Sequence, residues 1–231
     1  MKILALITAR GGSKRLPGKN IRMLSGRPLV VWSIDAIQDN PDVCHILVST
    51  DDRAIAAICE KAGALVPWLR PAELATDTSS SVDVALHALD WYEKEVGLVD
   101  GLLLLQPTSP YRTRHTIQRG LDLFREHDGE TVLGVSPASI HPMRTLKVSG
   151  NYLVPFMAEP GFDLRSQELP PVYVVNGSFY LIKPAQLREH RSFVTGKVLP
   201  LLITSEKEML DIDTELDWLI AEALVRHQDP C

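Results

Sequence analysis

A loop near the N-terminus gathers many of the residues in this sequence that could perform chemistry. Residues 9–20 read ARGGSKRLPGKN, with adjacent glycines at Gly11 and Gly12. Four positive charges so close together repel one another unless an anion lies between them. The glycines add a backbone that can approach a phosphate closely and turn its N–H groups inward. The loop is therefore expected to bind a polyphosphate through four cations, Arg10, Lys14, Arg15 and Lys19.

The same loop does not match the two common phosphate-binding motifs. A Walker A loop would require glycine at Ser13 and serine or threonine at Asn20, and a GxGxxG motif would require separated glycines. A solvated basic turn is the alternative interpretation. The position of the loop directly after a predicted strand favours phosphate binding, because open α/β sheets bind ligands at the carboxyl edge of their strands.

A pair of carboxylates near the C-terminus is the second candidate. Asp211 and Asp213 flank Ile212, and residues i and i+2 of an extended chain point to the same side. Two carboxylates on one side can share a hard cation such as Mg²⁺. The alternative is that Asp213 only caps the final helix, a common role for aspartate. We expect the pair to bind Mg²⁺.

Alternating strands and helices are predicted to position these groups. Short apolar runs predict strands, and apolar residues at helical spacing predict helices. Strands are predicted at residues 2–8, 45–49, 64–67, 101–105, 131–136, 172–175, 178–182 and 198–203. Helices are predicted from Pro28, at 52–62, 81–95 and 113–127, and from about Thr214. This order predicts an α/β fold with a doubly wound, mostly parallel sheet.

The alternation stops between residues 137 and 171. This stretch is rich in proline and glycine and lacks helical periodicity, which is unusual inside a compact domain. In a flexible loop, Tyr152, Leu153 and Phe156 would be exposed without reason. We therefore predict a β-rich dimerisation excursion at 137–171, within a single domain that covers residues 1–231, and expect it to pack on a partner subunit.

The composition limits the class of protein. The chain has 231 residues, of which 45% are hydrophobic and 23% charged, a balance typical of one soluble domain. A net charge of −5 argues against nucleic acid as a partner. No apolar run approaches the roughly 20 residues of a membrane span, so no membrane partner is expected. Cys44, Cys59 and Cys231 form no CxxC pair; with an N-terminal apolar run too short for a signal peptide, this predicts a cytoplasmic location.

The cationic loop also carries a resemblance to a known family. Its RGGSK and PGKN residues resemble the signature loop of the CMP-sialic acid synthetases, and the resemblance continues in order over nearly the whole chain. It implies a Rossmann-like nucleotidyltransferase that transfers CMP from CTP to the anomeric hydroxyl of a nine-carbon acidic sugar and releases pyrophosphate. It also implies that Arg10 and Lys19 engage the triphosphate, that Asn20 reaches the nucleotide and that the Asp211–Asp213 pair holds Mg²⁺. The rest of the implied CTP-binding loop is Gly11, Gly12, Ser13 and Lys14.

Two further segments resemble parts of this family that contact the base and the sugar. Residues 70–81 are similar to the base-recognition stretch, which implies that Arg70 donates to the cytosine carbonyl and that Ser81 caps the next helix near the base or ribose. Serines that merely begin a helix are the alternative. Gln106 is implied as a sugar contact, and its amide can both donate to and accept from hydroxyl groups. A proline-stiffened loop is the alternative there.

The third similar region includes the excursion and the strand after it. Arg165 and Asn176 lie in segments that resemble the Arg-x-Gln-x-Leu-Pro and Asn-Gly motifs of the family. An arginine is expected to bind the sugar carboxylate, because a guanidinium can hold both oxygens, and Arg144 competes with Arg165 for this role. Tyr180 and Phe193 are interpreted as core residues or pocket walls. The resemblance implies that both belong to the sugar-binding residues. The family pairs two subunits through this region, so a homodimer with shared active sites is implied, with Arg144 or Arg165 acting in trans.

Alternatives remain open for the substrate and for the activity. Arg15 occupies a position that is glycine in many sialate enzymes, which is closer to relatives that activate other nine-carbon acids, such as legionaminic or pseudaminic acid. Kdo cytidylyltransferases share the chemistry, but their loop usually ends in Gly-Lys-Pro, whereas this loop ends in Gly18, Lys19 and Asn20. A non-catalytic nucleotide-binding regulator is the alternative from another class, and the intact Lys19 and paired aspartates argue against it.

Overall fold

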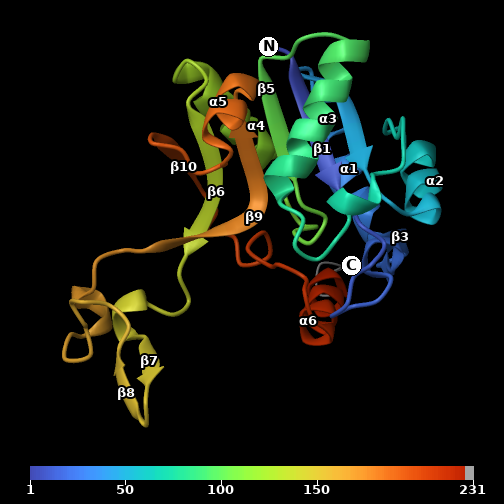
Figure 1. Ribbon diagram of the computed structural model, residues 1–231. Helices are drawn as coiled ribbons and strands as arrows, with labels where there is room; N and C mark the ends of the chain where they lie inside the picture. Colours follow the sequence, from blue (N-terminus) through green and yellow to red (C-terminus); the bar gives the residue numbers. More distant parts are fainter. Residues whose placement is uncertain (227–231) are drawn as a thin grey trace.

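The computed structural model describes residues 1–226, so Cys231 lies outside the described part of the chain. Its centre is a six-stranded sheet with strand order β10-β6-β9-β5-β1-β4 (Figure 1). Neighbouring strands are parallel except at β9, which runs antiparallel to both β5 and β6. The mostly parallel α/β fold is thereby confirmed. The strands are β1 (Ile3–Thr8), β4 (Val43–Ser49), β5 (Gly101–Leu105), β6 (Thr131–Pro137), β9 (Tyr173–Ile182) and β10 (Val198–Leu202).

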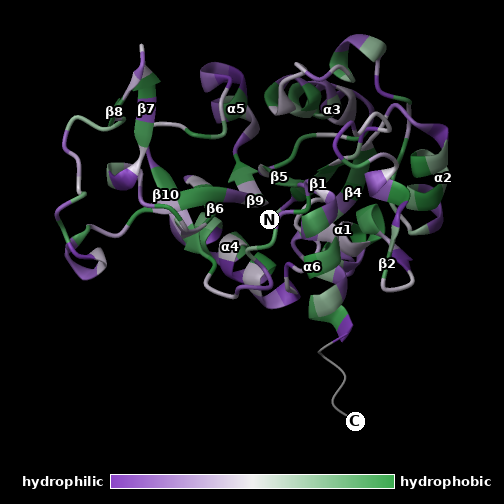
Figure 2. Cartoon of the chain, turned by 90° about the horizontal axis from the view of Figure 1, so that it is seen from below, coloured by the Kyte–Doolittle hydropathy of each residue, from purple (hydrophilic) through white to green (hydrophobic). Residues whose placement is uncertain are grey.

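Helices cover both faces of this sheet (Figure 2). One face carries α1 (Leu29–Ile37), α2 (Arg53–Lys61) and α4 (Arg114–Glu126), and the other carries α3 (Ser81–Glu95) and α5 (Pro184–His190). Residues 3–7 of β1 are fully buried, as expected of a parallel strand covered on both sides. Its alternate residues enter different apolar clusters, Ile3, Ala5 and Ile7 on the first face and Leu4 and Leu6 on the second. Across residues 1–226, no helix has the length and apolarity required to cross a membrane.

A third apolar cluster attaches the C-terminal helix to the cationic loop. In this cluster, Trp218 of α6 (Glu215–Arg226) joins Leu16 from the loop and Leu29 from α1. Arg22 adds two hydrogen bonds of 2.6 Å to Glu215 and lies 4.3 Å from the Trp218 ring centroid. The short strands β2 (Met23–Leu24) and β3 (Arg27–Pro28) form a hairpin between loop and α1. These contacts bring the segment before α6 next to the loop.

The excursion between β6 and β9 projects away from the body of the molecule (Figure 1). It contains an antiparallel hairpin, β7 (Leu146–Ser149) and β8 (Tyr152–Pro155), with a short 3-10 helix on either side (Pro142–Arg144 and Ser166–Glu168). Several of its large apolar side chains are exposed; Tyr152, for example, is 77% exposed. The hairpin agrees with the expected β-rich excursion, whereas packing on a partner stays a prediction.

The structure differs from the sequence-based prediction at three elements. Residues 64–67 make a single bridge from Leu65 to Leu47 and no strand. The two strands predicted at 172–175 and 178–182 are one strand, β9, because β6 pairs with both parts of it. The helix α5 was not predicted, since its seven residues are too few to show a clear period.

Candidate active site

A cavity of about 570 Å³ opens at the carboxyl ends of β1 and β5. Ligands of open α/β sheets bind at this edge, and the volume is typical of small-molecule sites. The walls come from the cationic loop, residues 70–84, the loop after β5 and the segment before α6. Residues from the sequence prediction that line the cavity are Arg10, Ser13, Lys14, Arg15, Lys19, Asn20, Arg70, Ser81, Gln106, Asp211 and Asp213. The fold therefore brings four distant segments together.

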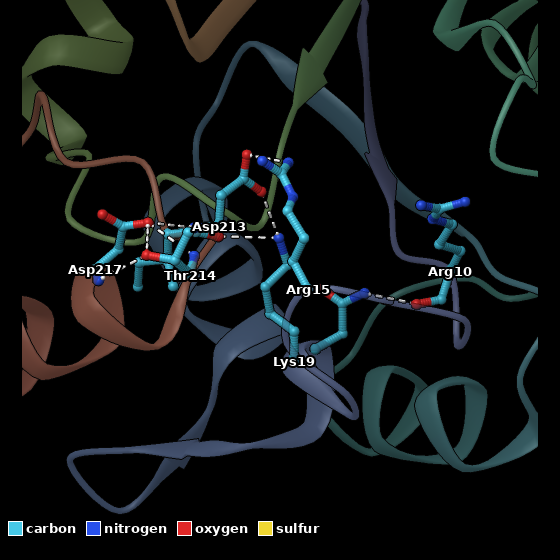
Figure 3. Close-up of polar contacts among 8 residues, drawn as sticks. Arg10, Arg15, Lys19, Asp213, Thr214 and Asp217 are labelled. Atoms are coloured by element: carbon cyan, nitrogen blue, oxygen red, sulfur yellow. Dashed lines mark hydrogen bonds and ion pairs between the residues drawn. The ribbon is translucent and has the colours of Figure 1, made fainter.

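Asp213 holds two of the four loop cations (Figure 3). The Nζ atom of Lys19 lies 3.0 Å from Asp213 Oδ1 and donates to the Ile212 carbonyl oxygen at 2.9 Å. The Nη2 atom of Arg15 lies 2.6 Å from Asp213 Oδ2. Lys19 is buried, and a buried ammonium needs a compensating partner. Asp213 supplies that partner at the cavity wall.

Asp77 holds the other two loop cations. The Nη1 atom of Arg10 lies 2.8 Å from Asp77 Oδ1, and Lys14 Nζ pairs with Asp77 Oδ2. Arg10 Nη1 also donates to the Thr76 carbonyl oxygen at 3.2 Å. Hydrogen bonds from Lys14 and Arg10 hold the pKa of Asp77 below its usual range. No sequence pattern marked Asp77 as a partner of the loop, because a single aspartate in a turn has many possible roles.

The adjacent glycines have a different role from the expected one. The N–H of Gly11 donates to Asp51 Oδ1 at 2.9 Å, so it is already occupied and does not face the cavity as predicted. A Cβ on Gly11 would lie 2.8 Å from Asp52 Oδ2, so glycine is required there for close packing. A Cβ on Gly12 would meet no atom within 4 Å. Neither glycine is part of the cavity lining.

Asn20 fixes the shape of the loop from inside. Its Nδ2 atom donates to the Arg10 carbonyl oxygen at 2.9 Å. Nearby, Gly18 has a φ of +67°, a left-handed conformation that favours glycine. Asn20 is buried and lines the cavity, so it is positioned both to hold the loop and to meet a ligand.

The Asp211–Asp213 segment presents both carboxylates to the cavity, as the alternation predicted. The intervening Ile212 is fully buried, and its N–H donates to the Thr108 carbonyl oxygen at 2.8 Å. Burial raises the pKa of Asp211, while a hydrogen bond from the Thr108 side chain opposes the shift. Within residues 1–226, no cluster of three or more His, Cys, Asp or Glu could hold a metal. Two carboxylates fit Mg²⁺ nevertheless, since this ion commonly completes its shell with substrate phosphates and water.

The cap of α6 excludes the alternative role of Asp213. Thr214 accepts the Asp217 N–H at 3.3 Å through Oγ1, and Asp217 Oδ2 accepts the Thr214 N–H at 2.8 Å. This reciprocal pair is a capping box. Asp213 is therefore not needed as the cap and is directed to the cations of the loop (Figure 3).

Arg70 lies in the cavity wall, where the end of β4 anchors it. Its Nε donates to Ser49 Oγ at 2.9 Å, and its Nη2 donates to the Ser49 carbonyl oxygen. Burial lowers the pKa of Arg70 to about 10, so it remains protonated at neutral pH. The cap of α3 is Ser80, whose Oγ accepts the Val82 N–H at 3.1 Å. The expectation that Ser81 caps this helix was therefore wrong; Ser81 begins α3 and lines the cavity.

Gln106 lies in the wall directly after β5, as expected, and a glycine approaches it closely. Gly177 has a φ of +77°, and a Cβ there would lie 2.6 Å from Gln106 Oε1. Asn176 lies outside the lining; its Oδ1 accepts the Ser178 hydroxyl at 2.7 Å. The Nδ2 atom of Asn176 is buried and has no hydrogen-bond partner among residues 1–226. The wall at Gln106 is thus shaped by an Asn-Gly pair in β9.

Arg112 is a further functional candidate, which no sequence motif indicated. Its Nε donates to the Ser178 carbonyl oxygen at 3.0 Å, its Nη1 to Ser33 Oγ at 2.6 Å and its Nη2 to the Gln106 carbonyl oxygen. Burial lowers the pKa of Arg112 to about 9, while the charges of Glu208 and other carboxylates oppose this shift. The guanidinium therefore holds β9, α1 and the Gln106 backbone in one arrangement.

Tyr180 and Phe193 lie in the core beside the site. Their rings meet edge to face with centroids 5.4 Å apart. Phe193 is buried, and burial raises the pKa of Tyr180, with a smaller contribution from Asp211. Neither side chain lines the cavity. Of the two interpretations, the core position is the one that the structure supports.

Arg144 and Arg165 are not brought to the cavity of their own chain. Neither residue lines it, and both belong to the projecting excursion (Figure 1). Arg144 Nη2 donates to the Leu164 carbonyl oxygen at 2.6 Å, and its Nη1 donates to Ser166 Oγ at 3.2 Å. The structure therefore gives neither arginine a role in cis, and their action in trans stays a prediction.

Known proteins resemble this chain in sequence and fold. The family described as Cytidylyltransferase matches residues 4–101. The "CMP-N,N'-diacetyllegionaminic acid synthase" of Legionella pneumophila is 40% identical over 227 residues, which cover 97% of each protein. An "N-acylneuraminate cytidylyltransferase" of Streptococcus agalactiae is 34% identical over 95% of this chain, which spans 52% of that protein. A solved CMP-2-keto-3-deoxy-manno-octonic acid synthetase with CTP shares the fold, with a TM-score of 0.73, 16% identity and coverage of 99% and 100% of the two chains.

Proposed function

Since this chain belongs to the acylneuraminate cytidylyltransferase family, we propose that it acts in the cytoplasm and transfers CMP from CTP to a nine-carbon acidic sugar. The observation that carries the proposal is the composition of the cavity. Four loop cations and the pair Asp211 and Asp213 meet in one space at the carboxyl edge of the sheet. A triphosphate is the ligand that matches this density of positive charge.

The loop cations neutralise the phosphate charge. Asp77 and Asp213 hold these cations at the cavity wall, and the phosphate oxygens of CTP would replace both carboxylates. Positioning and charge stabilisation supply most of the catalysis in phosphoryl transfer. We assign Arg10 and Lys19 to the triphosphate, with Gly11, Gly12, Ser13 and Lys14 forming the rest of its loop. Arg70, Asn20 and Ser81 are assigned to the nucleoside half of CTP.

The reaction is an in-line displacement at the α-phosphorus. The anomeric oxygen of the sugar forms the new P–O bond and loses its proton. The bond from the α-phosphorus to the oxygen that bridges to the β-phosphorus breaks, and pyrophosphate leaves. Gln106 would orient the sugar through its hydroxyl groups. Asp211 and Asp213 would hold Mg²⁺, which when bound neutralises phosphate charge and makes the attacking hydroxyl more acidic.

Among nine-carbon acids, we propose a legionaminic acid as the substrate. The support is the 40% identity, over nearly the full length, to the Legionella protein of that name. The streptococcal relative named for an acylneuraminate is less similar, at 34%. Kdo has weaker support, because the Kdo enzyme shares the fold at only 16% identity.

We further propose a homodimer in which each excursion completes the active site of the other subunit. The exposed apolar residues of the hairpin, Val148, Tyr152 and Leu153, support an interface. Arg144 or Arg165 of one subunit would then bind the sugar carboxylate in the site of its partner. This arrangement would supply a cationic group for the sugar carboxylate.

Pyrophosphate release from CTP and Mg²⁺ tests the proposed function. The acceptors are N,N'-diacetyllegionaminic, N-acetylneuraminic and pseudaminic acids, and Kdo. We expect turnover with a nine-carbon acid and the highest kcat/KM with the legionaminic acid. Turnover with Kdo alone would contradict the proposed substrate class. No turnover with any acceptor, despite CTP binding, would favour a non-catalytic nucleotide-binding protein.

A further inference from the structure

A turn in contact with the cationic loop supplies a carboxylate to that loop. Asp77 contacts Arg10 at 2.8 Å and also pairs with Lys14. Arg10 makes a second contact with this turn through the Thr76 carbonyl oxygen. The loop cations, Thr76 and Asp77 all belong to the lining of the cavity. The ion pairs therefore link two parts of its wall.

The turn itself is well braced. The N–H of Thr76 donates to Ser79 Oγ at 2.9 Å, and the Ser79 hydroxyl donates in turn to the Glu73 carbonyl oxygen at 3.1 Å. This local network fixes the backbone on both sides of Asp77. The carboxylate is thus presented to the loop by its own turn rather than by the loop cations alone. Its side chain is partly exposed, so an isosteric replacement should leave the fold intact.

We propose that Asp77 occupies, in the free protein, the anion position that the triphosphate takes between Arg10 and Lys14, and therefore competes with the triphosphate for these cations. The inference rests on the proposed function, because it assumes that CTP binds to these cations. A triphosphate beside an ionised Asp77 would be repelled by it. Binding therefore requires the two cations to exchange Asp77 for phosphate oxygens. Asp213, in contrast, can exchange Lys19 and Arg15 for a metal ion, because it is paired with Asp211.

This exchange weakens the binding of any ligand whose phosphates must reach Arg10 and Lys14. CTP carries enough negative charge to replace the carboxylate on both cations. The penalty from Asp77 therefore falls on CTP, whereas CMP, with its single phosphate, need not displace the carboxylate. We therefore expect Asp77 to lower the affinity for CTP to a useful range and to keep Arg10 and Lys14 unavailable to other small anions.

The test is calorimetric binding of CTP and CMP to the wild-type protein and to Asp77→Asn, without sugar. We expect the substitution to tighten CTP binding by about three- to tenfold, the range expected from removing two exposed ion pairs. CMP does not reach these cations, so its affinity should change less than about twofold. Asp77→Glu, which retains the charge, should behave like the wild type.

Asp83→Asn is the matched control for net charge. Asp83 lies on α3, close in sequence to Asp77, but pairs with Arg191 instead of the loop. This control should leave CTP affinity unchanged. Unchanged or weaker CTP binding by Asp77→Asn would overturn the inference, as would equal tightening by Asp83→Asn. If the wild-type protein binds no CTP, the proposed function fails together with the role of Asp77. If the wild-type protein turns over CTP but Asp77→Asn does not bind CTP more tightly, only the role of Asp77 fails.

Discussion

The charged residues of the cavity and those of the excursion differ in where their partners lie. At the cavity, each loop cation has a carboxylate partner from a distant segment of the same chain, as Lys19 has in Asp213. In the excursion, the Arg144 guanidinium hydrogen-bonds to Leu164 and Ser166 of the excursion itself, and apolar side chains such as Tyr152 are exposed. The nucleotide half of the proposed site is therefore assembled within one chain. The proposed group for the sugar carboxylate lies on the excursion, which we propose to be a dimer interface.

The largest expected effect is on the cavity side of this comparison. Lys19→Met should lower kcat/KM by about 100- to 1,000-fold, because a buried cation aimed at developing phosphate charge cannot be replaced by solvent. Steady-state pyrophosphate release measures the loss. Lys197→Met is the control, since Lys197 is exposed and lies 3.8 Å from Glu130, away from the cavity. Near-normal activity of Lys19→Met would remove the loop from the catalytic account.

The excursion should affect the other substrate. A double substitution, Arg144→Ala with Arg165→Ala, should raise KM for the sugar by about 100-fold through the loss of charge-assisted hydrogen bonds. The affinity for CTP, measured by calorimetry, should stay the same. A variant that loses CTP binding instead would contradict the division of the site into a nucleotide half and a sugar half.

Substitution of Arg112 tests whether the cavity wall at Gln106 depends on one buried guanidinium. Arg112→Met should lower the free energy of unfolding by about 2 kcal/mol, because the carbonyl oxygens of Ser178 and Gln106 lose their donor. Ser33→Ala removes only one of the three contacts and should cost about 1 kcal/mol. Urea unfolding measures both. An Arg112→Met protein as stable as the wild type would show that these bonds are not needed to hold the wall.

The smallest expected effect is a gain in stability at the cost of function. Burial raises the pKa of Asp211, so the folded state disfavours its ionised form. The resulting penalty is present at neutral pH and disappears as the pH falls through the raised pKa towards the ordinary value of 3.8. Asp211→Asn should therefore raise the melting temperature at pH 7 while it lowers Mg²⁺-dependent turnover. A lower melting temperature at pH 7 would show that Asp211 stabilises the fold as a carboxylate.

The sequence predicted what depends on local pattern. The first strand, the α3 helix and the 101–105 strand follow from apolar runs and spacing, and the cationic loop and aspartate pair follow from motifs. The prediction failed where long-range pairing overrides a local signal. Asn176 and Gly177 look like a turn, yet Gly177 lies within β9 at a φ of +77°, close to a register shift in the pairing with β6. The strand continues because β6 pairs with it both before and after Gly177.

In the candidate site, too, local patterns could be predicted and long-range contacts could not. The spacing of Arg10 to Lys19 indicated an anion site, but nothing local showed that the Gly11 N–H is taken by Asp51. Asp77 and Arg112 gained their roles from segments far away in the chain. A single charged residue outside a motif carries no sequence signal of its partner, so these contacts required the three-dimensional structure.

Subunit complementation tests the shared site most directly. Lys19→Met protein is co-refolded with the Arg144→Ala, Arg165→Ala double variant, and pyrophosphate release is compared with that of each variant alone. If the excursion acts in trans, each mixed dimer regains one intact site, and an equal mixture should recover about one quarter of wild-type activity. If the mixture is no more active than the sum of its inactive parents, the excursion does not complete the site of a second subunit.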